Sequence, residues 1–333
     1  MIQQSIPKTP QWQRELQDAV RQPDELFSLL GLDSQELNFS AEASKQFPLR
    51  VPRSFVDRMR QGDWNDPLLR QVLPINQELI PVTGYSNDPV ADISNLAAPG
   101  VIHKYKTRAL LITTGACAVH CRYCFRRHYP YQEEHAGKQN LDPALRYIEE
   151  HSELNEILLS GGDPLSLPDA KIHQLSHALY DIPHIKRLRI HTRQPVVLPS
   201  RVTQGLLNAI SIWGNNAVIV LHVNHANEIN DDLRAAITQL KSTGATLLNQ
   251  AVLLKGVNDS VAAQVNLSET LFSAGVLPYY LNLLDKVEGA AHFDIDEPTA
   301  LKLYRTVQKH LSGYLLPRLV RDHGGNDSKS LIV

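Results

Sequence analysis

The spacing of hydrophobic positions in this chain changes near residue 100. Beyond that point, apolar runs of strand length recur at 108–114, 155–162, 187–193, 217–224, 246–253 and 279–285. Helical spacing lies between most of them, at 168–180, 201–213, 230–244 and 260–275. Repeated strand–helix units of roughly 30 residues predict an α/β fold with a parallel sheet, closed or nearly closed. Six units indicate a partial (β/α)6-type barrel, which a seventh strand at 314–322 would extend.

The first hundred residues follow a different pattern. Amphipathic spacing predicts helices at 12–20 and 23–32, the second ended by Gly31, and one or two more helices within 47–74. Segment 86–100 is rich in turn residues and indicates a boundary. We therefore expect a mostly helical or irregular segment at 1–100 and a barrel domain at 101–333.

Composition and charge exclude several classes of protein. The net charge of −2 gives no basic field that would attract nucleic acid. No run of 18 apolar residues could cross a membrane, and the polar N-terminus does not resemble a secretory signal. We expect a cytoplasmic protein with neither a nucleic-acid nor a membrane partner.

Polar side chains gather where the predicted strands end. Because the carboxyl ends of parallel barrel strands open at one mouth, we expect these side chains to converge in space. They are the cysteines after the first run, 161–163 after the second, His191 and Arg193 after the third, 222–225 after the fourth, Asn249 and Gln250 in the fifth, and Asp285 after the sixth.

The chain has three cysteines, and all fall within the motif Cys117-x-x-x-Cys121-x-x-Cys124. Such a cluster is a poor disulfide framework, and in a reducing compartment it indicates a metal or redox site. Thiolates bind iron–sulfur clusters and zinc. With only three cysteines, one iron of a four-iron cluster would be open to another ligand. The alternative is structural zinc with His120 or His128 as the fourth ligand.

This spacing, after the first strand, resembles the radical S-adenosylmethionine (SAM) superfamily. The resemblance implies a [4Fe–4S] cluster on the three cysteines, whose open iron binds the amino and carboxylate groups of SAM. The segment Ser160-Gly161-Gly162-Asp163 resembles the family segment that contacts the methionine amino group. Glycines let the backbone approach a ligand, and free carbonyls or Asp163 can accept from an ammonium. Outside this context, such a segment is more often only a tight turn.

From about residue 100 onward the chain resembles the lysine 2,3-aminomutase family. The matching segments, in family order, are HKYKTRALL, CRYCFRRH, SGGDPL, HTRQPVVLPSR, LHVNHANEI, NQAVLLKGVND, PYYLNLLDKVEGAAHF and VRDHGGNDSK. The resemblance implies pyridoxal phosphate (PLP) bound to Lys329, although Asn326 and Asp327 dilute the family's glycine run. Without the resemblance, Lys329 would be taken for a solvated surface charge.

The resemblance also assigns substrate and cofactor contacts. Asp285 and Asp322 would bind the side-chain ammonium of lysine, because a buried charge is costly unless it is paired. Arg126 would bind the substrate carboxylate through its planar guanidinium. The alternative for all three is an ordinary surface ion pair. Cofactor contacts are expected from Lys104, Tyr105, Arg108 and Gln250, whereas His222, His225 and His292 also lie in matching segments but suit core roles equally well.

The implied reaction converts (S)-α-lysine into (R)-β-lysine by 5′-deoxyadenosyl radical chemistry on lysine held as an imine of PLP. The chain ends four residues after Lys329 and so resembles the short bacterial form that supplies β-lysine for modifying elongation factor P. Expected partners are L-lysine, an electron donor such as flavodoxin or ferredoxin, and a separate ligase that uses the product. Two alternatives stay open: a radical SAM enzyme of another reaction class, such as a methylase or another aminomutase, and a non-catalytic metal-binding module.

Overall fold

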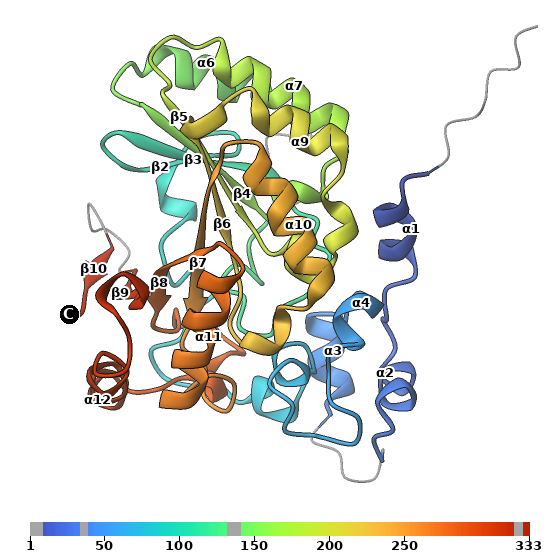
Figure 1. Cartoon of the computed structure of the whole chain (residues 1–333). Helices are drawn as coiled ribbons and strands as arrows, with labels where there is room; N and C mark the ends of the chain where they lie inside the picture. The colour runs from blue at the N-terminus through green and yellow to red at the C-terminus, as the bar shows by residue number, and fades with distance from the viewer. Residues whose placement is uncertain (1–8, 34–38, 132–140, 323–328) are drawn as a thin grey trace, which may run out of the picture.

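A computed structural model describes residues 9–33, 39–131, 141–322 and 329–333. Ten strands form one open sheet in the order in which they occur along the chain (Figure 1). Neighbouring strands from β3 to β9 pair in parallel. The strands are β1 Leu96–Ala98, β2 Val101–Tyr105, β3 Arg108–Thr114, β4 Glu156–Gly161, β5 Arg187–Thr192, β6 Ala217–Leu221, β7 Thr246–Val252, β8 Leu277–Asn282, β9 Arg318–Arg321 and β10 Ser330–Leu331.

The six predicted strands correspond to β3 to β8, and the seventh corresponds to β9, so the expected partial barrel is confirmed. Helices follow most of these strands and lie along the outer face of the sheet (Figure 1). The α-helices are α1 Gln11–Gln17, α2 Pro23–Leu30, α3 Ala41–Gln46, α4 Arg53–Val56, α6 Asp142–Glu150, α7 Asp169–Tyr180, α8 Gln194–Val197, α9 Gln204–Ser211, α10 Asp231–Ser242, α11 Val261–Ser273 and α12 Glu297–Val307.

Three short antiparallel strands at the sheet edges are absent from the sequence prediction. β1 and β2 precede β3, and β10 pairs with β9 near the chain end. Strands of two to five residues are too short to show a two-residue alternation, which explains the omission. Their role is positional, because β2 carries Lys104 and Tyr105, and β10 directly follows Lys329.

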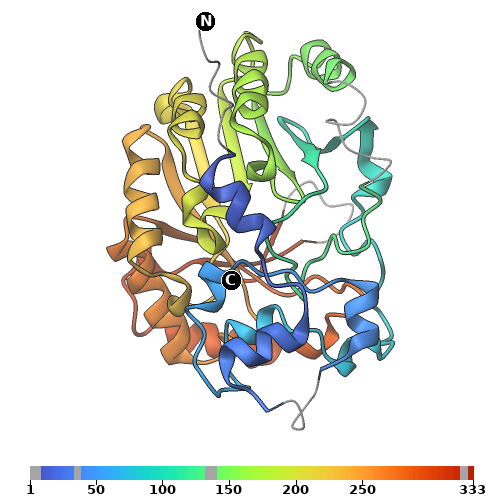
Figure 2. The same ribbon diagram turned by 90° about the vertical axis from the view of Figure 1, so that its right-hand side faces the viewer.

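The N-terminal helices pack against the end of the sheet that carries the cysteines (Figures 1 and 2). Helix α2 ends at Gly31, whose φ of 61° is the left-handed geometry that glycine adopts without strain. Apolar side chains of α1, α2 and α4 form one core cluster with Ala118 and Val119 of the cysteine loop and Val197 and Leu198 after β5. A larger core fills the space between the sheet and its outer helices. The N-terminal segment thereby packs against the loop on which the cysteines lie and stabilises its position.

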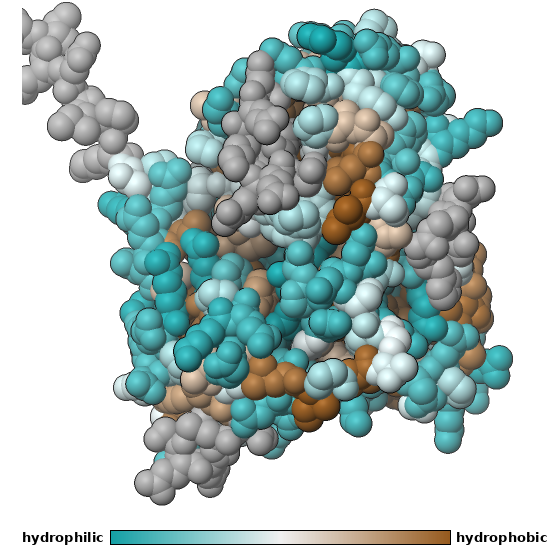
Figure 3. Space-filling model, turned by 180° about the vertical axis from the view of Figure 1, so that it is seen from behind, coloured by the Kyte–Doolittle hydropathy of each residue, from teal (hydrophilic) through white to brown (hydrophobic). Residues whose placement is uncertain are grey.

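No helix among the described residues is long and apolar enough to span a membrane. On the face shown in Figure 3, hydrophilic residues dominate and hydrophobic ones form small separate groups.

Candidate active site

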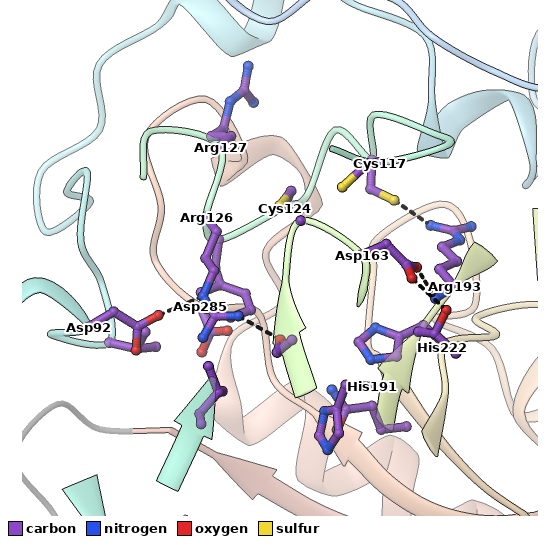
Figure 4. Close-up of a pocket in the computed structure, with 18 of the residues that line it drawn as sticks. Asp92, Cys117, Cys124, Arg126, Arg127, Asp163, His191, Arg193, His222 and Asp285 are labelled. Carbon is purple, nitrogen blue, oxygen red and sulfur yellow. Dashed lines mark hydrogen bonds and ion pairs between the residues drawn. The ribbon is translucent and has the colours of Figure 1, made fainter. Parts of the chain in front are cut away.

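A cavity of about 330 Å³ opens at the carboxyl ends of the parallel strands. It brings together side chains from loops after β3, β4, β5, β6, β8 and β9, which are far apart in sequence (Figure 4). Of the residues expected to bind a metal, a cofactor or the substrate, Gly161 alone does not line it, and of the polar groups expected to converge at the strand ends, Asn224, His225 and Asn249 do not line it either. The expected binding residues that do line it are Lys104, Tyr105, Arg108, Cys117, Cys121, Cys124, Arg126, Ser160, Gly162, Asp163, Gln250, Asp285, Asp322 and Lys329.

The three cysteines lie on the loop after β3, and none forms a disulfide. Burial raises the pKa of the Cys117 thiol, and the neighbouring Asp163 and the other two cysteines raise it further. Burial also raises the pKa of Cys124 to about 11. Thiols in this environment give up their protons only when a cation compensates the charge. The donor set therefore fits a metal centre.

Glycines of the second motif hold this loop close to β4. A side chain on Gly161 would place its Cβ 2.5 Å from the Thr114 carbonyl oxygen, and one on Gly162 would place it 2.5 Å from that of Ala116. The Gly162 amide donates to the Thr114 carbonyl at 2.7 Å. These glycines are needed for the approach of two protein segments, whether or not a ligand also contacts them.

Asp163 is committed to hydrogen bonds within the chain. One carboxylate oxygen accepts from the Thr192 hydroxyl at 2.7 Å, and the other accepts from the backbone amides of Arg193 and Gln194 at 2.7 and 2.9 Å. The Leu165 amide adds a fourth donor at 3.0 Å. This geometry favours a role in joining the ends of β4 and β5 over direct acceptance from a ligand ammonium.

The alternative of a zinc ion has little support in the geometry. Within the described ranges, no three His, Cys, Asp or Glu side chains are arranged around one metal ion. The His120 ring shares a hydrogen bond with the Pro48 carbonyl, and His128 is 3.3 Å from the Glu288 carbonyl. In a cubane cluster each cysteine binds its own iron, so the sulfurs need not converge on one point. The arrangement favours the cluster.

Arg193 is a buried residue whose contact with a cysteine was not predicted. Its guanidinium donates to Cys121 Sγ at 2.9 Å and to the Tyr123 hydroxyl, and it donates to Gln71 and Glu228 on its other side. The sequence places Arg193 at a strand end but does not show that Gln71, 122 positions earlier, would meet it.

Glu78 forms a second buried network that was not predicted. Its carboxylate accepts from Arg122 at 2.9 and 2.6 Å and from Arg127 at 2.8 Å. The Glu78 and Arg122 side chains are 1% and 0% exposed, so each depends on the other for charge compensation. Arg122 lies within the cysteine motif and Arg127 follows it, and these basic residues are the sequence signal that could have suggested an acidic partner.

Asp92 joins two residues that were expected to contact different ligands. Its carboxylate oxygens accept from Lys104 Nζ at 2.6 Å and from Arg126 Nε at 2.7 Å (Figure 4). These charges keep the pKa of Asp92 below its usual value despite burial. Arg126 also donates to the Ser160 hydroxyl at 2.9 Å. The preceding Ala91 has a φ of 57°, a conformation that costs energy for a residue with a side chain.

Two histidines line the cavity beside these groups. The Nε2 atoms of His191 and His222 are buried and have no hydrogen-bond partner among the described residues. Burial lowers the pKa of both rings, to about 3 for His222, so they are neutral at pH 7. Two unpartnered polar atoms at a cavity wall fit a ligand that hydrogen-bonds to them. By contrast, His225 and His292 do not line the cavity.

Lys329 reaches the cavity because β10 pairs with β9. Ser330 lies opposite Arg321, which places Lys329 beside the end of β9. Its ammonium donates to Asn282 Oδ1 at 2.7 Å and lies 5.6 Å from the centre of the Tyr280 ring. The expected glycine-rich stretch before it, 324–328, lies outside the described residues.

Asp285 and Asp322 follow the paired strands β8 and β9 and face the same cavity. Neither carboxylate has a hydrogen-bond donor within the described part of the chain. Burial and the nearby Asp322 and Asp92 raise the pKa of Asp285 to about 7, against the opposing effect of Lys329. The negative charge of Asp322 and burial raise the pKa of Tyr105 to about 12, with Arg108 stacked 4.2 Å from that ring. Two acids at a cavity wall that find no donor among the described residues fit a cationic ligand.

Comparisons with known proteins agree with this site. Residues 111–263 match the Radical SAM superfamily. The L-lysine 2,3-aminomutase of Escherichia coli K12 is 48% identical over 98% of this chain and 95% of that protein. The enzyme of the same name from Haemophilus influenzae is 44% identical over 96% and 95%, and that from Clostridium subterminale is 31% identical over 97% and 77%. Similarity across nearly the whole length shows that the chain belongs to the L-lysine 2,3-aminomutase family, within the radical SAM superfamily.

Proposed function

We propose that this protein is an L-lysine 2,3-aminomutase that converts (S)-α-lysine into (R)-β-lysine. Family membership implies a [4Fe–4S] cluster, SAM and PLP. The observation that carries the proposal is that three cysteines, Lys329 and the two acids Asp285 and Asp322 share one cavity. When bound, the cluster with SAM supplies radical hydrogen transfer, and PLP supplies a covalent carrier for the migrating amino group.

Each cofactor would be held by a different wall of the cavity. The cluster would bind Cys117, Cys121 and Cys124, with SAM beside Ser160 and the backbone of the glycine segment. PLP would bind Lys329, whose amine Asn282 orients through the 2.7 Å hydrogen bond. Lys104, Tyr105 and Arg108 lie on the same side as Asp322 and would supply cations and a hydroxyl to the PLP phosphate. We also retain Gln250 of β7 as a cofactor contact.

The substrate would be held at its two ends. Arg126 presents a guanidinium fixed by Asp92 and Ser160, which suits the lysine carboxylate. Asp285 and Asp322 would hold the side-chain ammonium. Arrival of that ammonium would drive the proton off Asp285, because a neighbouring positive charge lowers a carboxyl pKa. Lysine would therefore be selected over an acidic amino acid by charge and over a shorter basic one by distance.

Further details follow from the resemblance to the short bacterial form. We infer a cytoplasmic enzyme that takes its electron from flavodoxin or ferredoxin and passes β-lysine to a separate ligase acting on elongation factor P. The division into a segment at 1–100 and a barrel domain at 101–333 also stays a prediction.

The decisive test is an anaerobic assay of the reconstituted protein with lysine, SAM and PLP. We expect β-lysine, and we expect borohydride to trap PLP on Lys329, because reduction turns a Schiff base into a stable amine. Lys329→Ala should keep the cluster and lose both signals, whereas Lys286→Ala, at an exposed lysine nearby, should keep all three. Cleavage of SAM without β-lysine would indicate another class of radical enzyme. Stoichiometric zinc without sulfide would overturn the radical assignment.

A further inference from the structure

Arg193 lies where the cysteine loop, the N-terminal segment and the end of β5 meet. Its side chain is 6% exposed, and its guanidinium carbon is 5.5 Å from the ring centres of both Phe55 and Tyr123. The Arg193 amide donates to Asp163 at 2.7 Å, which fixes the backbone as well (Figure 4). A residue held at both ends in this way cannot move far.

Both ends of the guanidinium are already occupied by the protein. Nη1 donates to Cys121 Sγ at 2.9 Å and to the Tyr123 hydroxyl. Nη2 donates to Gln71 Oε1 at 2.7 Å and to Glu228 Oε2 at 3.1 Å. These four groups use the Nη donors and leave only Nε without a partner among the described residues, so Arg193 cannot offer two parallel donors to the carboxylate of SAM or lysine. Its contact with Cys121 needs another explanation.

The three cysteines differ in this respect. Within the described residues, only Cys121 accepts a hydrogen bond from a charged side chain. The arginine guanidinium stays protonated in proteins, and its ion pair with Glu228 at 3.1 Å holds the charge in place. A single fixed positive charge therefore lies against one of the three expected cluster ligands.

A positive charge at a ligand sulfur has a known physical effect. Adding one electron to a cluster increases its negative charge, so a nearby cation or N–H donor stabilises the reduced form more than the oxidised form. The reduction potential rises as a result. Reaction with SAM begins with this one-electron reduction, supplied by a low-potential donor.

We propose that Arg193 is a positioning residue for the cluster, which fixes the Cys121 sulfur and favours the reduced state. The inference rests on the proposed function because it requires that the three cysteines hold a cluster. It adds a role for a residue outside the cysteine motif, which directly follows β5 and lies far from the motif in sequence.

The test is a potentiometric titration of the anaerobic protein with dithionite, following the reduced cluster by electron paramagnetic resonance. Arg193→Gln should keep about four iron and four sulfide per chain and make reduction at least tenfold less favourable, a shift of about 59 mV to lower potential. Arg201→Gln is the matched control. Arg201 is also fully buried, but it pairs with Asp169 and has no contact with a cysteine. That variant should leave the potential unchanged.

Glu228→Gln provides a second variant with the opposite expected sign. It removes the negative charge that partly neutralises Arg193, so the potential should rise. Glu228 Oε1 also accepts from Gln71 Nε2 and from the amides of Asn224 and His225, so an amide oxygen at this position keeps its remaining donors. If Arg193→Gln does not fold, a rise in Glu228→Gln supports the inference and an unchanged potential overturns it.

An unchanged potential in a folded Arg193→Gln protein with a full cluster would also overturn the inference. That result would leave the aminomutase proposal intact, since β-lysine formation by the unaltered protein tests it separately. Absence of a cluster from the unaltered protein would instead refute the proposed function itself.

Discussion

The two sides of the cavity differ in how their charges are compensated. On the cluster side, Glu78, Arg122, Arg193 and Glu228 are buried, and each has a charged partner within hydrogen-bond distance. On the substrate side, the carboxylates of Asp285 and Asp322 have no hydrogen-bond donor within the described ranges. The charged residues around the cysteines are therefore compensated by one another, whereas Asp285 and Asp322 have no such compensation within the described ranges.

This difference indicates that the paired charges of the cluster side serve stability, whereas the acids of the substrate side serve recognition. Paired buried charges stabilise a single arrangement of the cysteine loop, and breaking one pair exposes the full cost of burying the other. Unpaired acids reduce the stability of the ligand-free protein but give a cationic substrate its binding energy. Mutations on the two sides should thus produce different phenotypes.

The largest effect is expected at the cysteines. Replacing Cys117, Cys121 or Cys124 with Ala should reduce iron and sulfide from about four each per chain to background, because each thiolate holds one iron of the cluster. Chemical iron and sulfide analysis after anaerobic purification measures this. Lys329→Ala is the control that keeps the cluster. Retention of full iron content in any one cysteine variant would contradict the ligand assignment.

A large loss of stability is expected on the cluster side. Glu78→Gln leaves Arg122 and Arg127 without their buried anion and should lower the free energy of unfolding by about 3–5 kcal/mol. Urea denaturation of the apoprotein measures it. The control is Glu25→Gln, which removes the exposed pair with Arg53 and should cost about 0–1 kcal/mol. Equal losses of unfolding free energy in the two variants would contradict the expectation that the buried ion pairs contribute more to stability than the exposed one.

The opposite phenotype is expected on the substrate side. Asp285→Asn and Asp322→Asn should each weaken lysine use by about 2–5 kcal/mol, roughly 30-fold to several thousand-fold in kcat/KM. Cluster content and PLP trapping at Lys329 should survive. Glu288→Gln, at an exposed acid close to Asp285 in sequence, is the control. Wild-type kinetics in both Asp variants would show that the pair does not bind the substrate ammonium.

The smallest effect concerns pH. The pKa of Asp285 is raised to about 7, so its charged form increases as pH rises through 7, and KM for lysine should fall about tenfold between pH 6 and pH 8. Stability should change in the opposite direction. At pH values between the ordinary Asp pKa and 7, the folded state binds more protons than the unfolded state. The contribution of Asp285 to the free energy of unfolding is therefore lost as pH rises through 7. Asp285→Asn should reduce the pH dependence of both KM and stability, which steady-state kinetics and thermal melts can check. A KM independent of pH in the unaltered protein would contradict a neutral Asp285 at low pH.

Sequence patterns predicted the parallel sheet well because each strand and helix there is long enough to show its periodicity. The same patterns placed Asp285 at the mouth, since the carboxyl ends of parallel strands open on one side, whereas Asp322 was expected there from the family resemblance. The periodicity of the sequence was thus enough to predict the position of a side chain that directly follows a strand.

The partners of those side chains were not predictable in the same way. Gln71 and Glu78 lie in short 3-10 helices and Asp92 precedes another, and their contacts with Arg193, Arg122 and Arg126 span between 34 and 122 positions. No periodicity connects such pairs. Asp163 shows the same limit, because its motif suggested a ligand contact but did not show that its carboxylate oxygens accept four hydrogen bonds from the chain itself.

The short strand β10 has a consequence for local unfolding. It joins the sheet through two residue pairs with β9 and one further hydrogen bond, from the Ile332 amide to the Leu319 carbonyl, and Leu331 and Val333 are 61% and 54% exposed, so that only Ile332 of these three packs against the main core. Segments of this kind open at a lower free energy than the whole domain. We expect the amides of 330–332 to exchange with solvent hydrogen faster than those of β5 to β7. If β10 opens in this way, we expect Lys329, the residue proposed to carry PLP, to become accessible to solvent while the parallel sheet stays folded.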